Sequence, residues 1–306
     1  MVNRRIQRLL LSSLLTPRSL WIAALSSLAL WSALTLGAPG RSIYGVNLAA
    51  AAVRDISTLL AFAIALLLCL KISGEHHRNR WLRAAWLCLA VCSAVSLVRY
   101  FFDTRLVDLA YPGYWSSPWS SILREIPAAV ALTFLAAGIL TMAAAFYRLG
   151  LGFRLRWYDA AAIAGVFVLL ALIVVFRNDL SAAHLQNSAV RHAQLFSQVM
   201  FSVAAAGSIV LFRIGKQMGG GHLALAMAWI IAHVVVRAGL VLASAIEVHL
   251  HLGSPAIGVL HTFLGLGASW MFAFAAASRY QLTRTASEQA AQWGIKASRD
   301  PMDAVA

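Results

Sequence analysis

The sequence predicts an all-α protein, a polytopic bundle of about eight transmembrane helices with both ends of the chain in the cytoplasm. Three observations predict this fold class. The 306 residues are 61% hydrophobic and only 12% charged, with a mean hydropathy of +0.76, whereas soluble domains carry about 25% charged residues. The apolar residues form long blocks, and most basic residues lie in the short segments between those blocks.

The blocks have the length that a membrane helix needs. A helix crosses the hydrocarbon core with about 20 apolar residues, and by that measure the candidate spans are residues 19–37, 52–71, 84–102, 127–147, 158–176, 197–213, 223–246 and 257–278. Continuous runs of this kind exclude a membrane β-barrel, whose strands alternate apolar and polar residues. We therefore expect a bundle over residues 1–279 and a short cytoplasmic tail over residues 280–306.

The first span has an alternative interpretation as a cleaved signal peptide, because it follows the basic start MVNRR. Its apolar stretch is longer than a signal core of about 7–15 residues, and Arg18 interrupts it. The candidate cleavage site after Ala38 has Leu36 where a small residue is needed, and Pro39 follows it. We expect this segment to be retained as an anchor.

The orientation follows from the distribution of the 25 Lys and Arg residues. The N-terminal arm, the loops after the second, fourth and sixth spans, and the tail hold four, four, three, two and four of them. These 17 cations lie on one side of the membrane, 7 lie on the other, and Arg237 lies within a span. Because cations remain on the cytoplasmic side, both termini are predicted to be cytoplasmic, in a bacterial-type inner membrane.

Two connections on the outer side are longer than the others. Residues 103–126 combine tyrosines and tryptophans with proline and glycine, which is typical of a segment at the membrane interface. Residues 177–196 are polar and predict a short surface helix. In the cytoplasm, the last helix is predicted to continue to about Gly294.

Ionisable residues within the spans are the candidate functional residues, because burying a charge in the membrane is costly. Arg237 lies about 21 Å along its helix from Leu223, and His233, four residues earlier, shares its face. We expect the Arg237 guanidinium to pair with a carboxylate, with Glu125, Asp55 and Glu247 as candidates in that order. The antiparallel topology predicts an outward-facing polar pocket formed by Arg54, Asp55, Arg99, Glu125, His233, Arg237, Glu247 and His261. The alternative is a set of ordinary interfacial charges with one buried Arg–carboxylate pair.

No cofactor is predicted. His233 and His261 lie at depths of about 15 and 26 Å from the inner ends of their helices, which is too far apart for one haem iron. No span interior contains a lysine that could form a retinal Schiff base. The pairs Cys88 and Cys92, His76 and His77, and His249 and His251 have spacings that allow metal ligation, but we interpret them as helix-core or interfacial residues, and we predict no catalytic residue and no metal site.

The chain resembles a group of bacterial multi-pass inner-membrane proteins of similar size that have no assigned function. The resemblance rests on the Leu97-Val98-Arg99 run, on residues 189–195 and on residues 222–237. It is a likeness of pattern over most of the chain, and it implies a helical membrane protein without implying a ligand.

Three functions are compatible with this sequence. The first is a non-enzymatic sensor-like or accessory module that needs another membrane or cytoplasmic protein as a partner. The second is a transporter of a small, anionic solute that uses Arg237 and Arg99 as countercharges. The third is an intramembrane enzyme with His233 or His261 as the acid–base group. Membrane lipid is an expected partner and nucleic acid is not, because the cations form no stripe interleaved with exposed aromatic residues.

Overall fold

The fold is described by a computed structural model over residues 16–37, 42–43, 46–76, 79–104, 107, 111–114, 117–151, 156–181, 188–218, 222–249 and 255–292. Within these ranges the chain forms eight helices and one antiparallel pair of two-residue strands. The elements are α2 (Pro17–Gly37), β1 (Ser42–Ile43), β2 (Val46–Asn47), α3 (Leu48–Glu75), α4 (Arg80–Phe102), α6 (Pro118–Arg148), α7 (Trp157–Ser181), α8 (Ser188–Gln217), α9 (His222–His249) and α10 (Pro255–Gln292).

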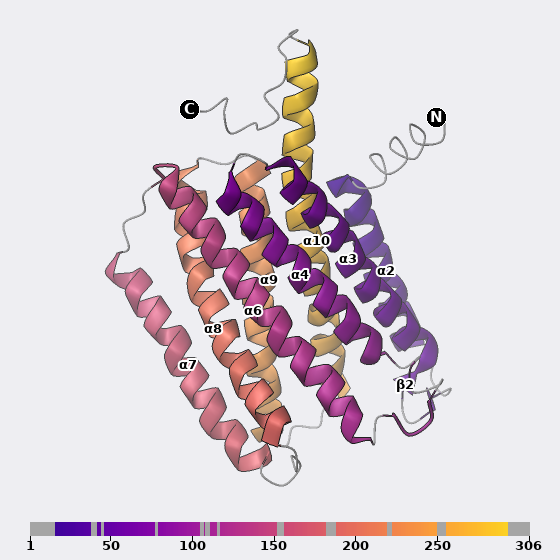
Figure 1. Ribbon diagram of the computed structural model, residues 1–306. Coiled ribbons are helices and arrows are strands. Elements are labelled where there is room, and N and C mark those ends of the chain that lie inside the picture. The colour runs from indigo at the N-terminus through magenta and orange to yellow at the C-terminus, as the bar shows by residue number, and fades with distance from the viewer. Residues whose placement is uncertain are drawn as a thin grey trace.

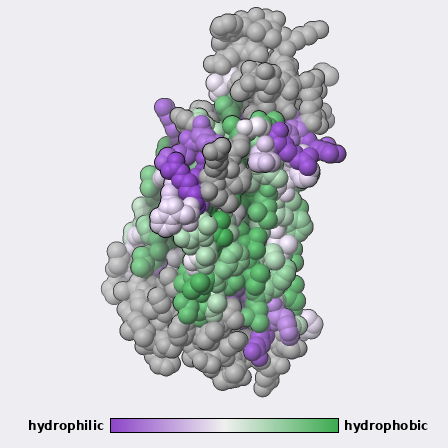
Figure 2. Space-filling model, turned by 90° about the vertical axis from the view of Figure 1, so that its left-hand side faces the viewer, coloured by the Kyte–Doolittle hydropathy of each residue, from purple (hydrophilic) through white to green (hydrophobic). Residues whose placement is uncertain are grey.

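The all-α class is confirmed, and each predicted span overlaps one helix. Among the described residues, six helices are long and apolar enough to cross a membrane, namely α3, α4, α6, α8, α9 and α10. Hydrophobic side chains cover the middle of the face in Figure 2, with hydrophilic side chains above and below them. These features show a multi-pass membrane protein; the count of eight remains a prediction because it also requires α2 and α7 to cross.

The six apolar helices form a closed ring. Going around it, α3 packs on α4, α4 on α6, α6 on α8, α8 on α9, α9 on α10, and α10 again on α3. The other two helices lie outside this ring: α2 packs against α3 and α10, and α7 packs against α8 and α9. In Figure 1, successive helices alternate in direction, and α2 begins at the end of the bundle where α10 leaves it. We call this the inner end, because the cation count predicts it to be cytoplasmic, and the opposite end the outer end.

Local sequence signals account for several helix ends. The Asn79 side chain accepts hydrogen bonds from the backbone N–H groups of Trp81 and Leu82, at 3.2 and 3.1 Å, and so caps the start of α4. At the start of α6, Pro118 occupies the first turn, where its missing N–H costs nothing. After this helix ends, Gly150 adopts a φ of 82°, a left-handed conformation that glycine adopts without strain.

Two predicted connections need correction. In the predicted surface segment 177–196, the described residues 177–181 and 188–196 belong to the long helices α7 and α8 instead of a separate short helix. Similarly, α6 begins at Pro118, inside the segment that was predicted to lie along the membrane interface. Polar residues at both positions extend a spanning helix beyond its apolar stretch. At the inner end, α10 continues beyond the bundle to Gln292 (Figure 1).

The inner half of the ring is a tightly packed apolar core. Small residues allow the helices to approach closely. A Cβ atom placed on Gly138 of α6 would lie 2.9 Å from Leu89 Cδ2 of α4, and one on Gly207 of α8 would lie 2.8 Å from Ile139 Cγ2 of α6. The buried residues that fill this half include Leu68, Ile72, Leu82, Trp86, Leu89, Ile139, Met142, Phe146, Leu211, Ile214, Met227 and Ile230.

Polar contacts join the helices at the inner end. Arg213 of α8 holds Asp159 of α7 in an ion pair with an N–O distance of 2.7 Å, which links the peripheral helix to the ring. His76, whose pairing with His77 had allowed a metal site, is buried with its Nε2 atom 3.0 Å from Arg279 Nη2 of α10. His77 lies outside the described residues. We assign His76 a role in joining α3 to α10.

Candidate functional site

A polar contact crosses the outer half of the ring. Arg237 on α9 donates a hydrogen bond from Nη2 to the hydroxyl oxygen of Tyr100 on α4. Its guanidinium carbon also lies 5.6 Å from the centre of the Tyr100 ring. The Tyr100 ring also stacks on Phe62 of α3, with centroids 5.3 Å apart and planes inclined by 19°. Because α4 and α9 lie opposite each other in the ring, we call this contact the Arg237–Tyr100 bridge.

Two cavities lie beside the bridge and share Arg99, Tyr100 and Arg237. The first, which we call the amphipathic cavity, has a volume of about 250 Å³ and is partly open to the surface. Its polar lining comes mainly from α4, α8 and α9, and its apolar lining mainly from α6 and α7. Its polar lining residues are Ser96, Arg99, Tyr100, Glu125, Gln194, Ser197, Gln198, Ser202, His233 and Arg237.

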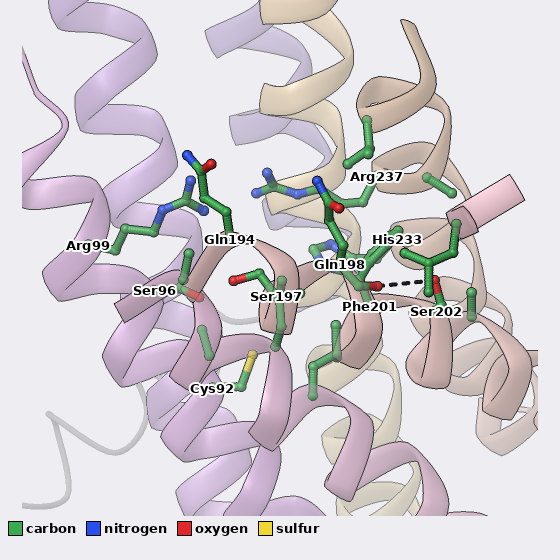
Figure 3. Close-up of a pocket in the computed structure, with 18 of the residues that line it drawn as sticks. Cys92, Ser96, Arg99, Gln194, Ser197, Gln198, Phe201, Ser202, His233 and Arg237 are labelled. Atoms are coloured by element: carbon green, nitrogen blue, oxygen red, sulfur yellow. Dashed lines mark hydrogen bonds between the residues drawn. The ribbon is translucent and has the colours of Figure 1, made fainter. Parts of the chain in front are cut away.

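The arrangement of these side chains is visible in Figure 3. The guanidinium groups of Arg99 and Arg237 reach toward each other from opposite sides, and the amides of Gln194 and Gln198 lie at the same end of the cavity. Cys92 lies toward the other end. The Ser202 hydroxyl donates to the backbone carbonyl of Gln198 at 3.0 Å and is therefore directed along its own helix. The charged end of this cavity is the end near the outer surface.

The second cavity, which we call the polar vestibule, has a volume of about 220 Å³. It lies between α3, α4, α9 and α10, on the other side of the Arg237–Tyr100 bridge. Burial raises the pKa of the Asp103 carboxyl at the end of α4, although neighbouring arginines oppose this effect. Its lining residues are Arg54, Asp55, Thr58, Arg99, Tyr100, Asp103, Arg237, Leu240, His261, Thr262, Gly265, Leu266 and Ser269.

The structure brings seven of the eight sequence-predicted pocket residues to these two cavities. Glu125 and His233 line the amphipathic cavity, and three line the polar vestibule: Arg54, Asp55 and His261. Arg99 and Arg237 line both. The side chain of Glu247 lies outside the described residues. The predicted single pocket is thus two cavities, separated by the Arg237–Tyr100 bridge.

Two of the three carboxylates predicted as partners of Arg237, Glu125 and Asp55, need correction, and the third, Glu247, has a side chain outside the described residues. Asp55 pairs with its neighbour Arg54 at 2.6 Å, and Glu125 pairs with its neighbour Arg124 at 3.3 Å. Among the described residues, no carboxylate lies within ion-pair distance of Arg237, and its hydrogen-bond partner is a tyrosine hydroxyl. Sequential Arg–acid pairs satisfy these carboxylates locally, which leaves the Arg237 charge directed toward the cavities.

His233 is held in one orientation. It is 5% exposed, and its Nδ1 atom lies 2.7 Å from the backbone carbonyl oxygen of Ala268 on α10. A carbonyl oxygen only accepts, so Nδ1 carries a proton and donates it to this bond. The ring also packs against Phe272, with centroids 5.2 Å apart. His261 lines the other cavity. The two histidines therefore do not form a joint acid–base pair.

Several lining residues were missed by sequence reasoning. Gln194, Ser197, Gln198, Phe201 and Ser202 all face the amphipathic cavity from α8. Their spacing of three and four residues places them on one helix face, and that periodicity is the signal that could have identified them. Gln194 was assigned to the surface segment 177–196, and the other four lie in the predicted span 197–213 but are uncharged, so a search for ionisable residues within spans did not select them. Tyr100 was missed because a tyrosine near a helix end is typical of the membrane interface.

Metal ligation has no support within the described ranges, since no three His, Cys, Asp or Glu residues there are grouped closely enough to hold an ion. Cys92 lines the amphipathic cavity and Cys69 is buried in the core. No protein-family model, curated protein or solved structure matches the chain.

Proposed function

We propose that this chain is a non-enzymatic, sensor-like or accessory membrane module that binds a small solute from the outer side of an inner membrane. The observation that carries the proposal is the difference between the two halves of the ring. The outer half contains two cavities with polar linings, whereas the inner half is packed mainly with apolar side chains, and its buried polar groups, such as His76 and Arg279, contact each other at the inner end. Such an arrangement supports binding without passage.

The inner seal favours this role over transport. Leu89, Ile139 and Met142 are buried on α4 and α6, about one to two helical turns nearer the inner end than the lining residues Cys92 and Leu135. The contact between Gly138 and Leu89 leaves no room for a water-filled path between these helices. A transporter of an anion would need polar groups through the full thickness, or a second conformation that opens the inner half. Because Arg99 and Arg237 line the cavity and would attract an anion, an anion transporter is the second candidate function.

The third candidate, an enzyme, has less support. The cavities separate His233 from His261, and the Nδ1 atom of His233 is already bonded to a backbone carbonyl. General acid–base catalysis needs a positioned group together with a reacting partner, such as a nucleophile or a bound metal. The groups facing the amphipathic cavity are better suited to holding a ligand.

A sensor-like module must pass its state to a partner. The inner extension of α10 is the part of the described chain that leaves the bundle on the predicted cytoplasmic side (Figure 1). This helix also borders both cavities, through Phe272 in one and Ser269 in the other. We place the proposed contact with a membrane or cytoplasmic protein on this extension.

Cysteine accessibility tests the proposal. In a background with the three native cysteines replaced by alanine, Ser96→Cys places a thiol in the amphipathic cavity. Ser93→Cys is the matched control: Ser93 lies three residues earlier on α4, is 0% exposed and donates to the Leu89 carbonyl at 3.0 Å. A membrane-impermeant methanethiosulfonate is added to vesicles of either orientation.

We expect Ser96→Cys to react from the outer side and not from the inner side, and Ser93→Cys to react from neither. Reaction of Ser96→Cys from both sides would show that the cavity alternates its access, and would replace the proposal with the transporter. Absence of reaction from either side would overturn the accessible pocket on which the proposal depends.

A further inference from the structure

The amphipathic cavity has a positive end. Arg99 and Arg237 both face it, and among the described residues neither guanidinium forms an ion pair. The carboxylate that also lines it, Glu125, is held by Arg124 at 3.3 Å. Asp103 lies near Arg99 on the side of the polar vestibule, without forming an ion pair with it. A ligand at this end meets two cationic side chains, so an anionic group is favoured.

Two buried polar atoms at the same end are left without a hydrogen-bond partner. They are Arg99 Nε and Gln198 Oε1. Gln198 is only 9% exposed, and Figure 3 shows its amide at the same end of the cavity as the Arg237 guanidinium. Buried polar groups are nearly always satisfied in folded proteins. An oxygen-rich headgroup can accept a hydrogen bond from Arg99 Nε, and a water molecule bound to that headgroup can donate one to Gln198 Oε1.

The rest of the cavity is apolar. Its wall is formed by aliphatic side chains on α6 and α7, including Leu132, Leu135, Leu169, Leu170 and Ile173. The volume of about 250 Å³ corresponds to about eight groups of the size of a water molecule, at about 30 Å³ each. A bilayer lipid tail needs a larger volume than this cavity offers. The space fits a short single chain attached to a small headgroup.

We infer that the amphipathic cavity binds an amphiphilic monoanion, with its carboxylate between Arg99 and Arg237 and a chain of about six to eight carbons along α6 and α7. This rests on the proposed function, because it names the ligand class of the same binding site. Charge selects the headgroup, and the apolar wall selects the chain.

Binding of octanoate tests the inference. The full chain is placed in nanodiscs of phosphatidylcholine, and saturable binding of radiolabelled octanoate is measured against empty nanodiscs. Unlabelled octanoate should compete, whereas acetate, octanol and octyltrimethylammonium should not. Each of these three compounds lacks one feature: the chain, the charge or the correct sign of charge.

Variants separate the two ends of the site. Arg99→Gln and Arg237→Gln should each weaken octanoate binding about tenfold or more, as the loss of a charge-assisted contact predicts. Arg83→Gln, an exposed arginine on α4 that lines neither cavity, is the matched control and should bind normally. Leu169→Phe should weaken octanoate binding and leave butanoate binding unchanged, because it shortens the apolar end. This last result does not depend on any arginine and would not arise from misfolding.

Several outcomes would overturn the inference. They are the absence of saturable octanoate binding, competition by octanol equal to that by octanoate, or unchanged binding in both arginine variants. If phosphatidylglycerol in the nanodisc competes with octanoate in the wild type and not in Arg237→Gln, the anion site stands, and its natural occupant is a lipid headgroup with its tails in the bilayer. If Ser96→Cys reacts from the outer side but octanoate neither binds nor slows that reaction, the ligand class is wrong and the proposed function survives.

Discussion

The Arg237–Tyr100 bridge makes a quantitative prediction about stability. Tyr100→Phe removes the hydroxyl oxygen that accepts the hydrogen bond from Arg237 and leaves the ring in place. Stacking of that ring on Phe62, at 5.3 Å, and its contact with the Arg237 guanidinium, at 5.6 Å, are both retained. The loss is therefore one hydrogen bond to a charged group, which contributes about 1.5–3 kcal/mol.

The free energy of unfolding can be measured by titration with SDS in mixed micelles. We expect Tyr100→Phe to lower it by about 1.5–3 kcal/mol. Tyr111→Phe is the control, because Tyr111 is 71% exposed, and a surface change of this kind alters stability by less than about 0.5 kcal/mol. Arg237→Gln and the double variant complete a double-mutant cycle, in which the coupling energy isolates the contact from the effect of each separate change.

The cycle should give a coupling of at least about 1 kcal/mol. A coupling near zero would show that the bridge does not hold α4 to α9, even if each single variant is destabilised. Equal destabilisation by Tyr100→Phe and Tyr111→Phe would refute the reasoning more directly, since it would mean that the contact has no special role.

Four further predictions follow from other parts of the structure. A periplasmic reporter fused to the tail should be inactive and a cytoplasmic one active; the reverse would refute the orientation taken from the cations. Gly138→Ala should destabilise the protein by about 1–3 kcal/mol, because the added Cβ would lie 2.9 Å from a leucine methyl carbon, whereas Gly165→Ala, with open space around it, should change little. Asp159→Asn should lower the thermal midpoint by releasing Arg213 from its ion pair, and exchanging the two residues by a double substitution should restore it. Because the pKa of Asp103 is raised in the folded state, the folded protein binds this proton more tightly than the unfolded chain does. Stability should therefore fall as the pH rises from about 3.8 through the raised pKa. Asp103→Asn should flatten this part of a plot of thermal midpoint against pH.

The helices were largely predictable because the membrane imposes a simple rule. A backbone in hydrocarbon must satisfy its own hydrogen bonds, so long apolar runs become helices. All eight predicted spans overlap a helix in the described structure, and the errors lie at polar helix ends. At 188–196 the residues of α8 are too polar to resemble a span, yet they are helical, and one of them, Gln194, lines the amphipathic cavity.

The depth of the candidate-site residues in the membrane was predictable from the sequence, but the contacts between them were not. Alternation of helix direction places Arg54, Arg99, Arg237 and His261 at similar depths, which the order of spans alone implies. The pairing within the site was not predictable in this way. Asp55 and Glu125 are neutralised by the arginine next to each of them in the chain, while Arg237 contacts a residue that is 137 positions away in sequence.

The amino-acid sequence alone determined that this chain is a bundle of membrane helices with a set of ionisable residues at a common depth in its outer half, because apolar length and charge placement are local properties. Only the tertiary structure decided which helices are neighbours, because that depends on how glycine and other small residues on one helix fit the side chains of the next. From that fit follow the ring of six helices, the position of α7 outside it, and the separation of the outer half into two cavities. Helix rotation, which no single span encodes, turned Tyr100 toward Arg237 and made a tyrosine the partner of the buried charge.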